Sequence, residues 1–393
     1  MDESRYRQLA AQLSERGTDV PEVERLLSAQ RIETPSWGYG RSGTRFGAFP
    51  QPGEPRTTLE KLEDAAAVQR ATGVCPSVAI HIPWDIVDDW DELAGQVRDL
   101  GLQIGAVNPN LFQEQEYKLG SLCHPAAAVR RKAVDHMLEC VAIAETVGSD
   151  AISLWLADGT SYPGQDDIAD RRRRLIDCLG EVVAAMPPSQ RLLVEYKLYE
   201  PAFYHTDLAD WGGALLVCQA LGEQTKVLVD LGHHAQSVNI EHIVSTLLGE
   251  GRLGGFHFNN RKYGDDDLIV GSVNPFELYL IYHELVNGAA DRAGVGYVID
   301  QSHNVEAKIE AMILSVTNLQ AAYAKALLVD RAALAAAQVA GDVVEAHRLI
   351  VDAYSIDVRP LCAKVREGLG AAADPLTAHR ASGYDAKAAE RRR

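Results

Sequence analysis

The sequence predicts an α/β protein built on a (β/α)8 TIM barrel, with helices before the barrel and a helical arm after it. Short runs rich in β-branched residues alternate with longer segments that carry the Ala/Leu periodicity of helices. Successive runs start roughly 25 to 45 residues apart, which is the length of one βα unit. Each run is almost continuously apolar, as is typical of parallel strands buried on both faces. Eight such units close into a barrel rather than an open sheet.

The elements follow in order along the chain. Two amphipathic helices over 3–15 and 21–29 form an N-terminal extension, residues 1–30. The barrel spans residues 31–305, and its first strand is placed in the Gly-rich aromatic loop near 36–47. The other seven strands are predicted at 78–83, 103–108, 151–157, 191–197, 226–232, 254–260 and 295–301. Residues 306–393 form a C-terminal helical arm, with an extended or weakly helical tail beyond 370, and we expect the arm to pack on a partner subunit.

Composition and charge narrow the class of protein. The chain has 38 Lys and Arg against 55 Asp and Glu, a formal net charge of −17. Nucleic-acid binding needs clustered Lys and Arg, so we expect no such partner, and we interpret the run Arg171 to Arg174 as one solvated helix face. No stretch of about 18 apolar residues and no apolar signal-peptide core is present, so we expect no membrane partner and a cytoplasmic location. The six cysteines lack CxxC spacing and are interpreted as buried free thiols.

Polar side chains gather where the last four predicted strands end. In a barrel of this type the active site lies at the C-terminal ends of the strands. Carboxylates packed closely repel each other unless a cation neutralises them, and an oxygen and nitrogen shell without thiolate suits Mn²⁺, Mg²⁺ or Co²⁺. The candidate ligands are Glu195, Asp230, His233, His257, Asp265, Asp267 and Asp300. This set is too large for one ion, which indicates two.

The spacing divides these candidates between the two ions. One residue from each of four strands can surround a first ion: Glu195, Asp230, His257 and Asp300. A second ion can be held by three further residues, with Asp230 bridging the pair: His233, Asp265 and Asp267. Taken singly, a strand-end Asp is more often a helix cap and a buried His more often a core residue. The functional interpretation rests on their common position at one rim.

Six segments of the chain carry a resemblance to a known family: GTRFGAF, HIPWD, VEYK, VDLGHH, HFNNRKYGDDD and VIDQSHN. In this order and spacing they resemble the L-rhamnose isomerase family, in its broad-specificity bacterial type, over residues 30–305. The resemblance implies a xylose-isomerase-like barrel, a homotetramer and two divalent ions, Mn²⁺ with Co²⁺ or Mg²⁺ as alternatives. It also implies an aldose–ketose isomerase that converts L-rhamnose to L-rhamnulose and related sugars by a metal-assisted 1,2-hydrogen shift.

The resemblance also implies roles for individual residues. The four residues of the first group resemble ligands of a structural ion, and the second group, with Asp230, resembles the shell of a catalytic ion. Catalytic roles are implied for Lys197, Asp267 and His81. Substrate contacts are assigned to Trp84, Trp155 and Ser302, and Phe46 resembles an aromatic side chain lent by a neighbouring subunit.

The residues alone leave some of these roles open. Lys197 either donates to a substrate oxygen or forms a salt bridge with Glu195 or Glu200. Trp84 and Trp155 either stack on the apolar face of a sugar or simply pack at the barrel mouth.

Alternative interpretations are also open for His81, for Phe46 and for the reaction itself. Asp85 could fix the tautomer of His81, and Phe46 either packs inside its own barrel or enters the active site of a neighbour. A proton transfer through an enediol, with a carboxylate as base, is the alternative to the hydride shift. A ketose 3-epimerase and a metal-dependent phosphoester hydrolase on the same barrel are the alternative functions. The negative charge and the carboxylate-rich rim weigh against the hydrolase.

Overall fold

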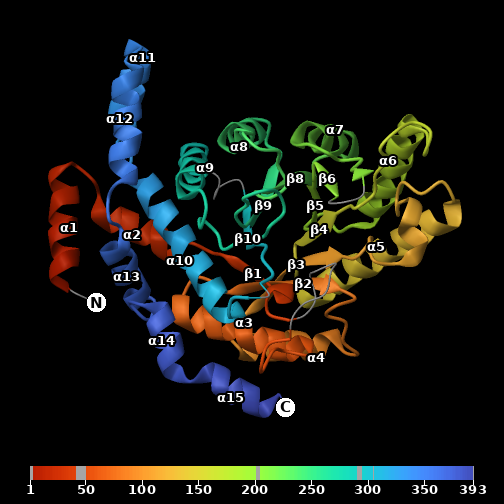
Figure 1. Ribbon diagram of the computed structural model, residues 1–393, viewed down its shortest axis with the longest axis horizontal. Helices are drawn as coiled ribbons and strands as arrows, with labels where there is room; N and C mark the ends of the chain where they lie inside the picture. The colour runs from red at the N-terminus through yellow and green to blue at the C-terminus, as the bar shows by residue number, and fades with distance from the viewer. Residues whose placement is uncertain (1–2, 41–49, 201–203, 290–293, 304, 393) are drawn as a thin grey trace.

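The computed structural model shows a closed barrel of eight parallel strands inside a ring of helices (Figure 1). It describes residues 3–40, 50–200, 204–289, 294–303 and 305–392. The strand order around the barrel is β1-β10-β9-β8-β5-β4-β3-β2, with β1 closing onto β2. The strands are β1 (Glu33–Pro35), β2 (Ser77–Ile82), β3 (Gln103–Pro109), β4 (Ala151–Trp155), β5 (Arg191–Glu195), β8 (Thr225–Asp230), β9 (Leu253–Phe258) and β10 (Gly296–Ile299). The predicted fold class is confirmed.

The first strand lies earlier than predicted. β1 is the segment Glu33–Pro35, which precedes the aromatic loop and pairs with β2 and β10. It is only three residues long and ends in Pro, so it is too short to give an alternating pattern in the sequence. The aromatic loop begins instead with the 3₁₀ turn η1 (Ser36–Gly38). At Gly38 a Cβ atom would lie 2.8 Å from the carbonyl oxygen of Gln301, so the turn packs directly on the end of β10.

Eight helices surround the barrel: α3 (Thr58–Thr72), α4 (Trp90–Asp99), α5 (Ala127–Val147), α6 (Ile168–Ala185), α7 (Trp211–Leu221), α8 (Ile240–Gly249), α9 (Pro275–Asn287) and α10 (Lys308–Leu327). Most begin at a residue whose side chain caps the first turn. Thr57 and Glu60 form a capping box at α3, and Asp167 accepts a hydrogen bond from the backbone N–H of Asp170 at α6. α10 packs against both α9 and α3 and so completes the ring.

Helices also precede and follow this ring. α1 (Glu3–Glu15) and α2 (Val20–Ser28) agree with the two predicted N-terminal helices. After α10 come α11 (Arg331–Ala340), α12 (Val343–Tyr354), α13 (Arg359–Gly368), α14 (Pro375–Ser382) and α15 (Tyr384–Arg391). α11 and α12 project from the barrel in Figure 1, whereas α13 to α15 run along its outside. The division into extension, barrel and arm stays a prediction.

The tail beyond residue 370 is helical rather than extended. Asp374 caps α14 and Pro375 occupies its first turn, two signals that start a helix. The guanidinium of Arg392, whose side chain is 2% exposed, donates to both carboxylate oxygens of Asp64 on α3 at 2.8 and 3.0 Å. This buried ion pair holds the tail against the barrel, a tertiary contact that no local pattern reports.

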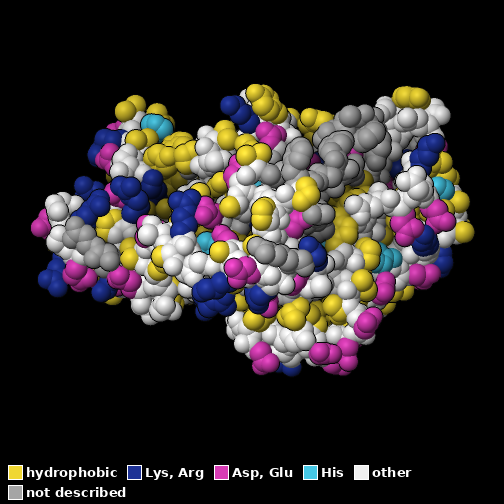
Figure 2. Space-filling model, turned by 60° about the horizontal axis from the view of Figure 1, so that its bottom comes forward, with side chains coloured by type: hydrophobic (Ala, Val, Ile, Leu, Met, Phe, Trp, Pro, Cys, Tyr) yellow, Lys and Arg dark blue, Asp and Glu magenta, His cyan; other side chains and the backbone are white. Residues whose placement is uncertain are grey.

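The surface mixes charges of both signs. Figure 2 shows Lys and Arg side chains interspersed with Asp and Glu over one face of the molecule. Among the described residues no single helix is long and apolar enough to cross a membrane; α10 and α11 pass such a test only as a pair, with a 61° bend between them. All six cysteines are free thiols, and five of them are buried.

The Arg171 to Arg174 run is not one solvated face. Arg173 is exposed, but Arg171 is only 2% exposed and the side chain of Arg174 only 15%. Three residues apart on α6, these two lie on one face of the helix. That face turns toward the loops at the end of the barrel, where Asp166 accepts hydrogen bonds from both guanidinium groups.

Candidate metal centre

Side chains that point into the barrel bring the site together. Leu193 of β5 and Leu228 of β8 help to fill the barrel interior. Because every second side chain of a strand faces the same side, Glu195 and Asp230 face that interior two positions later, where these strands end. The same rule turns inward the other rim residues His81, Asn108, Trp155, His257 and Asp300.

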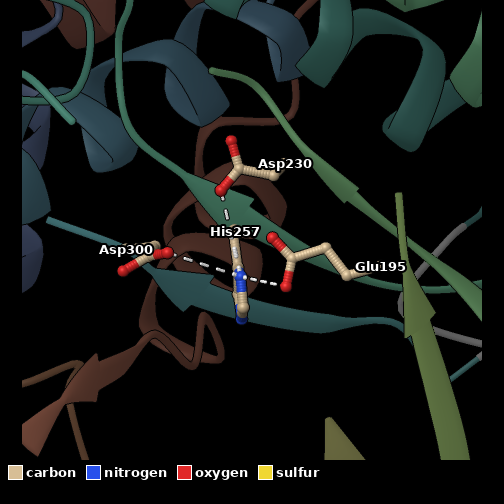
Figure 3. Close-up of side chains that lie close together, drawn as sticks. All are labelled: Glu195, Asp230, His257 and Asp300. Atoms are coloured by element: carbon tan, nitrogen blue, oxygen red, sulfur yellow. Dashed lines mark ion pairs between the residues drawn. The ribbon is translucent and has the colours of Figure 1, made fainter. Parts of the chain in front are cut away.

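Four of the predicted ligands form one tight group (Figure 3). They are Glu195 on β5, Asp230 on β8, His257 on β9 and Asp300 just after β10. One ligand atom from each lies within 4.8 Å of the other three. The Nδ1 atom of His257 is 3.2 Å from Oε2 of Glu195, 3.6 Å from Oδ2 of Asp300 and 3.9 Å from Oδ2 of Asp230. The structure thus gathers all four residues that were expected around the first ion.

The group concentrates negative charge where water is excluded. Burial raises the pKa of Asp230 to about 6, with Glu195 acting in the same direction, and burial likewise raises the pKa of Asp300. Burial also opposes ionisation of Glu195, but His257 and His233 outweigh it and hold its pKa below the usual range. Burial lowers the pKa of His257, and the charge of Glu195 more than reverses this, to about 9. The buried carboxyl groups of Glu195 and Asp230 and the partly exposed one of Asp300 therefore share one or two imidazolium groups.

The donor set fits a divalent cation. Both ring nitrogens of His257 are buried and have no hydrogen-bond partner in the part of the chain that the structure describes. Buried polar atoms without a hydrogen-bond partner are rare in folded proteins, so each one needs a physical explanation. A cation between the imidazole and the carboxylates would satisfy the nitrogen and reduce the repulsion. Oxygen ligands with one nitrogen and no thiolate suit Mn²⁺, Mg²⁺ or Co²⁺.

The residues expected around a second ion lie beside this group but bond to protein atoms. Nε2 of His233 lies 2.9 Å from Oδ1 of Asp265, and Nδ1 lies 3.1 Å from Oε1 of Glu195. Asp267 accepts a hydrogen bond from the amide of Asn259, which also donates to Asp230. His234, the neighbour of His233, does not line the pocket and bonds to the Tyr196 hydroxyl instead.

The loop that carries Asp265 and Asp267 has an unusual backbone. Both residues adopt left-handed conformations, with φ of 56° and 46°. Such angles are uncommon outside glycine, and Asp tolerates them better than most residues. Between them, Asp266 accepts backbone hydrogen bonds from Lys262, Tyr263 and Gly264, which closes the loop. The two flanking carboxylates are thereby turned toward the pocket, which they both line.

Lys197 forms one of the two salt bridges expected for it and one that was not expected. Its ammonium group lies 3.4 Å from Oε2 of Glu200 and also bonds Asp265. The expected alternative partner Glu195 faces His233 and His257 instead. The ammonium lies 4.8 Å from the ring centre of Trp155, a cation–π contact.

Asp85 does not bond to the imidazole of His81, so the expectation that it fixes the tautomer is wrong. Its carboxylate accepts from the backbone N–H of His81 at 2.8 Å, from the hydroxyl of Ser36 and from the ammonium of Lys61. The reason is the tight turn after β2, which folds Asp85 back over the backbone rather than toward the ring. The imidazole stacks on Trp84 with ring centres 3.9 Å apart, and burial lowers its pKa to about 3.

A cavity of about 430 Å³ opens over the candidate ligands. Part of its lining is charged and comes from Glu195, His257, Asp300 and the 265–267 loop, and another part, the aromatic wall, comes from five ring side chains. The aromatic wall consists of Trp37, His81, Trp84, Phe112 and Trp155. Phe112 lies 4.6 Å from Trp155, 5.8 Å from His81 and 6.0 Å from Trp84 between ring centres. A small ligand with one polar and one apolar side would suit this lining.

Several of these lining residues were not among the residues predicted for the site. Phe112 and Asn108 follow or end β3, and Trp37 follows β1 and donates to Oδ1 of Asp300 at 2.7 Å. The signal was available, because the strand-end rule that selected the last four strands applies to the first three as well. Ser302 lines the cavity as expected, and its hydroxyl oxygen is buried. Phe46 lies outside the described residues.

Two proteins named as probable sugar isomerases are similar to almost the whole chain. A "probable sugar isomerase" of Rhizobium meliloti (strain 1021) is 45% identical to this chain, over 98% of this chain and 92% of its own length. Another, of Mesorhizobium japonicum (strain LMG 29417 / CECT 9101 / MAFF 303099), is 44% identical over the same shares of the two chains.

Solved structures and a family model agree on the barrel. An L-ribulose 3-epimerase matches with a TM-score of 0.54 and 16% identity, over 77% of this chain and 98% of its own. A D-psicose 3-epimerase of Clostridium cellulolyticum H10 matches with a TM-score of 0.51 and 13% identity, over 76% of this chain and 99% of its own. At such identities the likeness shows the fold alone. The family model described as "Xylose isomerase-like TIM barrel" matches residues 51–306. The chain therefore belongs to the xylose isomerase-like TIM-barrel family and is a homologue of sugar isomerases.

Proposed function

We propose that this chain is a metal-dependent aldose–ketose isomerase whose substrates are L-rhamnose and related sugars, with L-rhamnulose as the ketose product. The observation that carries the proposal is the group Glu195, Asp230, His257 and Asp300, in which one ligand atom of each residue lies within 4.8 Å of the others, and of which Glu195, His257 and Asp300 line the cavity. The aromatic wall of the cavity offers a surface on which the apolar side of a sugar can stack. The two relatives named as probable sugar isomerases cover almost the whole chain.

The isomerisation moves one hydrogen from C2 to C1 of the open-chain sugar and one proton from O2 to O1. Bound divalent ions would act as Lewis acids that polarise these two oxygens. The ammonium of Lys197 is positioned to donate to a substrate oxygen as negative charge develops there. The carboxylate of Asp267, whose pKa burial and the nearby Asp265 raise, is suited to hold and pass on the hydroxyl proton. His81, neutral and stacked on Trp84, is assigned the outer end of the sugar chain.

The remaining parts of the proposal concern the ions and the assembly. Glu195, Asp230, His257 and Asp300 would hold one ion, and His233, Asp265 and Asp267, with Asp230 bridging, would hold a second. We propose Mn²⁺ for both, with Co²⁺ or Mg²⁺ able to replace it. Binding at the second position requires Asp265 to exchange the ammonium of Lys197 for the cation. A homotetramer, with Phe46 completing a neighbour's cavity, and a cytoplasmic location stay predictions.

The charges of the cavity favour a neutral sugar over a phosphoester. Lys197 is the one Lys or Arg among the described residues that line it, and Glu200 and Asp265 neutralise that charge. A phosphate group needs an excess of positive donors. A ketose 3-epimerase would act on similar sugars, so only the products separate it from an isomerase.

Product analysis tests the proposal. The Mn²⁺-loaded protein is incubated separately with L-rhamnose, with a ketohexose and with a phosphodiester, and the products are read by NMR. We expect L-rhamnulose from L-rhamnose, and no cleavage of the phosphodiester to a phosphomonoester and an alcohol. The variant Asp300→Asn should lose this turnover, because it removes one carboxylate of the metal group. A 3-epimer formed from the ketose, without any aldose, would identify an epimerase and contradict the proposal.

A further inference from the structure

Arg171 is a buried cation that the proposed reaction does not use. It is 2% exposed, near the start of α6 and outside the cavity. Its neighbour Arg173, on the same helix, has a side chain that is 65% exposed and pairs with Asp170. Burying a guanidinium is costly unless its donors are all satisfied. The partners of Arg171 therefore indicate what its burial achieves.

The guanidinium of Arg171 joins three separate loops at the C-terminal end of the barrel. Its Nε and Nη2 atoms donate to the carboxylate of Asp207, at 3.0 and 2.9 Å, in the loop after β5. Nη1 donates at 3.0 Å to the carbonyl oxygen of Leu119 in the loop after β3, and at 3.1 Å to Asp166 in the loop after β4. The planar fork of an arginine can serve all three at once, whereas the single ammonium of a lysine cannot.

Asp207 lies between two residues that form hydrogen bonds with the backbone of Lys197. The hydroxyl of Thr206 donates to the carbonyl oxygen of Lys197. The backbone N–H of Lys197 donates to the carbonyl oxygen of Leu208 at 2.9 Å. Asp207 itself donates its backbone N–H to the carbonyl oxygen of Asp158 at 2.9 Å. Arg171 thus anchors the middle residue of the segment 206–208, and the residues on either side hold Lys197.

We propose that Arg171 is a positioning residue: through the segment 206–208 it sets the place of Lys197, and hence of the ammonium that faces the cavity. Lys197 lies two residues past the end of β5 and is not itself part of a barrel strand, so its backbone depends on this contact. In the structure its side chain reaches Glu200, Asp265 and the face of Trp155 together. The effect on turnover rests on the proposed isomerase function, whereas the effect on the backbone does not.

The matched substitutions Arg171→Lys and Arg173→Lys test this role in the full-length, Mn²⁺-loaded protein. Both keep the positive charge on α6, but only the first removes the three-loop contact. Hydrogen exchange measured by mass spectrometry should be faster by about tenfold at the amides of 196–198 and 206–208 in Arg171→Lys, and any other change should be confined to the loops that hold Leu119 and Asp166. With L-rhamnose, kcat/KM should fall by about 10- to 100-fold, mainly through kcat, because Lys197 is displaced from the developing charge. Arg173→Lys should match the wild type in both measurements.

Each other outcome has a defined meaning. Equal exchange in the two variants would overturn the proposal, and so would faster exchange spread over the whole chain, which would indicate general stabilisation. Local exchange that rises with kcat/KM unchanged would overturn the functional half. If Arg171→Lys does not fold, Asp207→Asn, which weakens the same contact without removing Arg171, takes its place in the same comparison. A wild type without isomerase activity would contradict the proposed function, while the exchange data would still decide whether Arg171 positions Lys197.

Discussion

The ammonium group of Lys197 is bonded to the carboxylate of Asp265. Each was expected to serve a different partner, the lysine a substrate oxygen and the aspartate a metal ion. In the structure they neutralise each other, and His233 contacts the second oxygen of the same carboxylate. An ion at the proposed second position would therefore compete with Lys197 for Asp265.

This competition predicts opposite effects of Lys197→Met on binding and on turnover. Loss of a positive charge beside the second position should tighten Mn²⁺ binding there by roughly tenfold or more. kcat should fall, because the donor to the substrate oxygen is gone. Isothermal titration with Mn²⁺ and steady-state kinetics measure the two effects. Lys262→Met, at an exposed position of the neighbouring loop, is the control and should change neither. Weaker Mn²⁺ binding in Lys197→Met would show that Lys197 supports the site instead.

The substitutions Asp267→Asn and Glu195→Gln should distinguish the roles of the two proposed ions. Glu195 is buried against His233 and His257, and its loss leaves His257 without its nearest carboxylate and His233 without the partner of its Nδ1 atom. Breaking such a buried pair costs about 3–5 kcal/mol of unfolding free energy, so both stability and turnover should fall. Asp267 is only partly buried, whereas Glu195 is fully buried, and other carboxylates crowd Asp267, so Asn should lower kcat strongly with little loss of stability. Thermal unfolding and kcat for both variants check this, and equal losses of stability would contradict the division.

Phe112→Ala should raise KM rather than lower kcat. Phe112 packs on Trp155 and borders His81 and Trp84, so it shapes the aromatic wall without reaching the ligand group. Loss of one aromatic contact of about 0.5–1.5 kcal/mol corresponds to a KM increase of roughly 3- to 10-fold. The exposed Tyr162, which does not line the cavity, provides the control Tyr162→Ala. A fall in kcat at unchanged KM would place Phe112 in the chemical step.

His283 should make the protein less stable in acid, independently of the metal site. Burial lowers the pKa of this α9 residue to about 4, with Arg331 acting in the same direction. Below pH 6.5 the unfolded chain binds a proton that the folded His283 does not, so its contribution to stability falls as the pH drops toward 4. His283→Gln should therefore gain about 2 kcal/mol relative to the wild type between pH 7.5 and pH 5. Thermal unfolding at both pH values, with exposed His347→Gln as control, measures this. Parallel pH dependence of wild type and His283→Gln would refute it.

The first ligand group was predictable because it follows from strand parity. Glu195, Asp230 and Asp300 each stand two positions after an inward-facing residue of the barrel core, and their strands end there. Strand ends and parity can both be read from a regular apolar pattern. The same reasoning, applied to β3, would also have found Asn108.

The contacts that depend on irregular backbone were not predictable. The bond between Lys197 and Asp265 needs the left-handed conformation of Asp265, which no periodic pattern reports. β1 was misplaced because three residues carry no period. The burial of Arg171 depends on three loops that are distant in sequence, so a run of four arginines does not reveal which of them faces inward.

Metal dependence of the Glu195, Asp230, His257 and Asp300 group tests the central claim most directly. The protein is stripped with a chelator, its metal content is measured, and turnover of L-rhamnose is followed while Mn²⁺ is added back. The stripped protein should be inactive, and activity should return as Mn²⁺ binds. The melting temperature should rise with it, because a ligand at a hundred times its Kd adds about 2.7 kcal/mol of stability. Full turnover in protein shown to be free of metal would contradict the account.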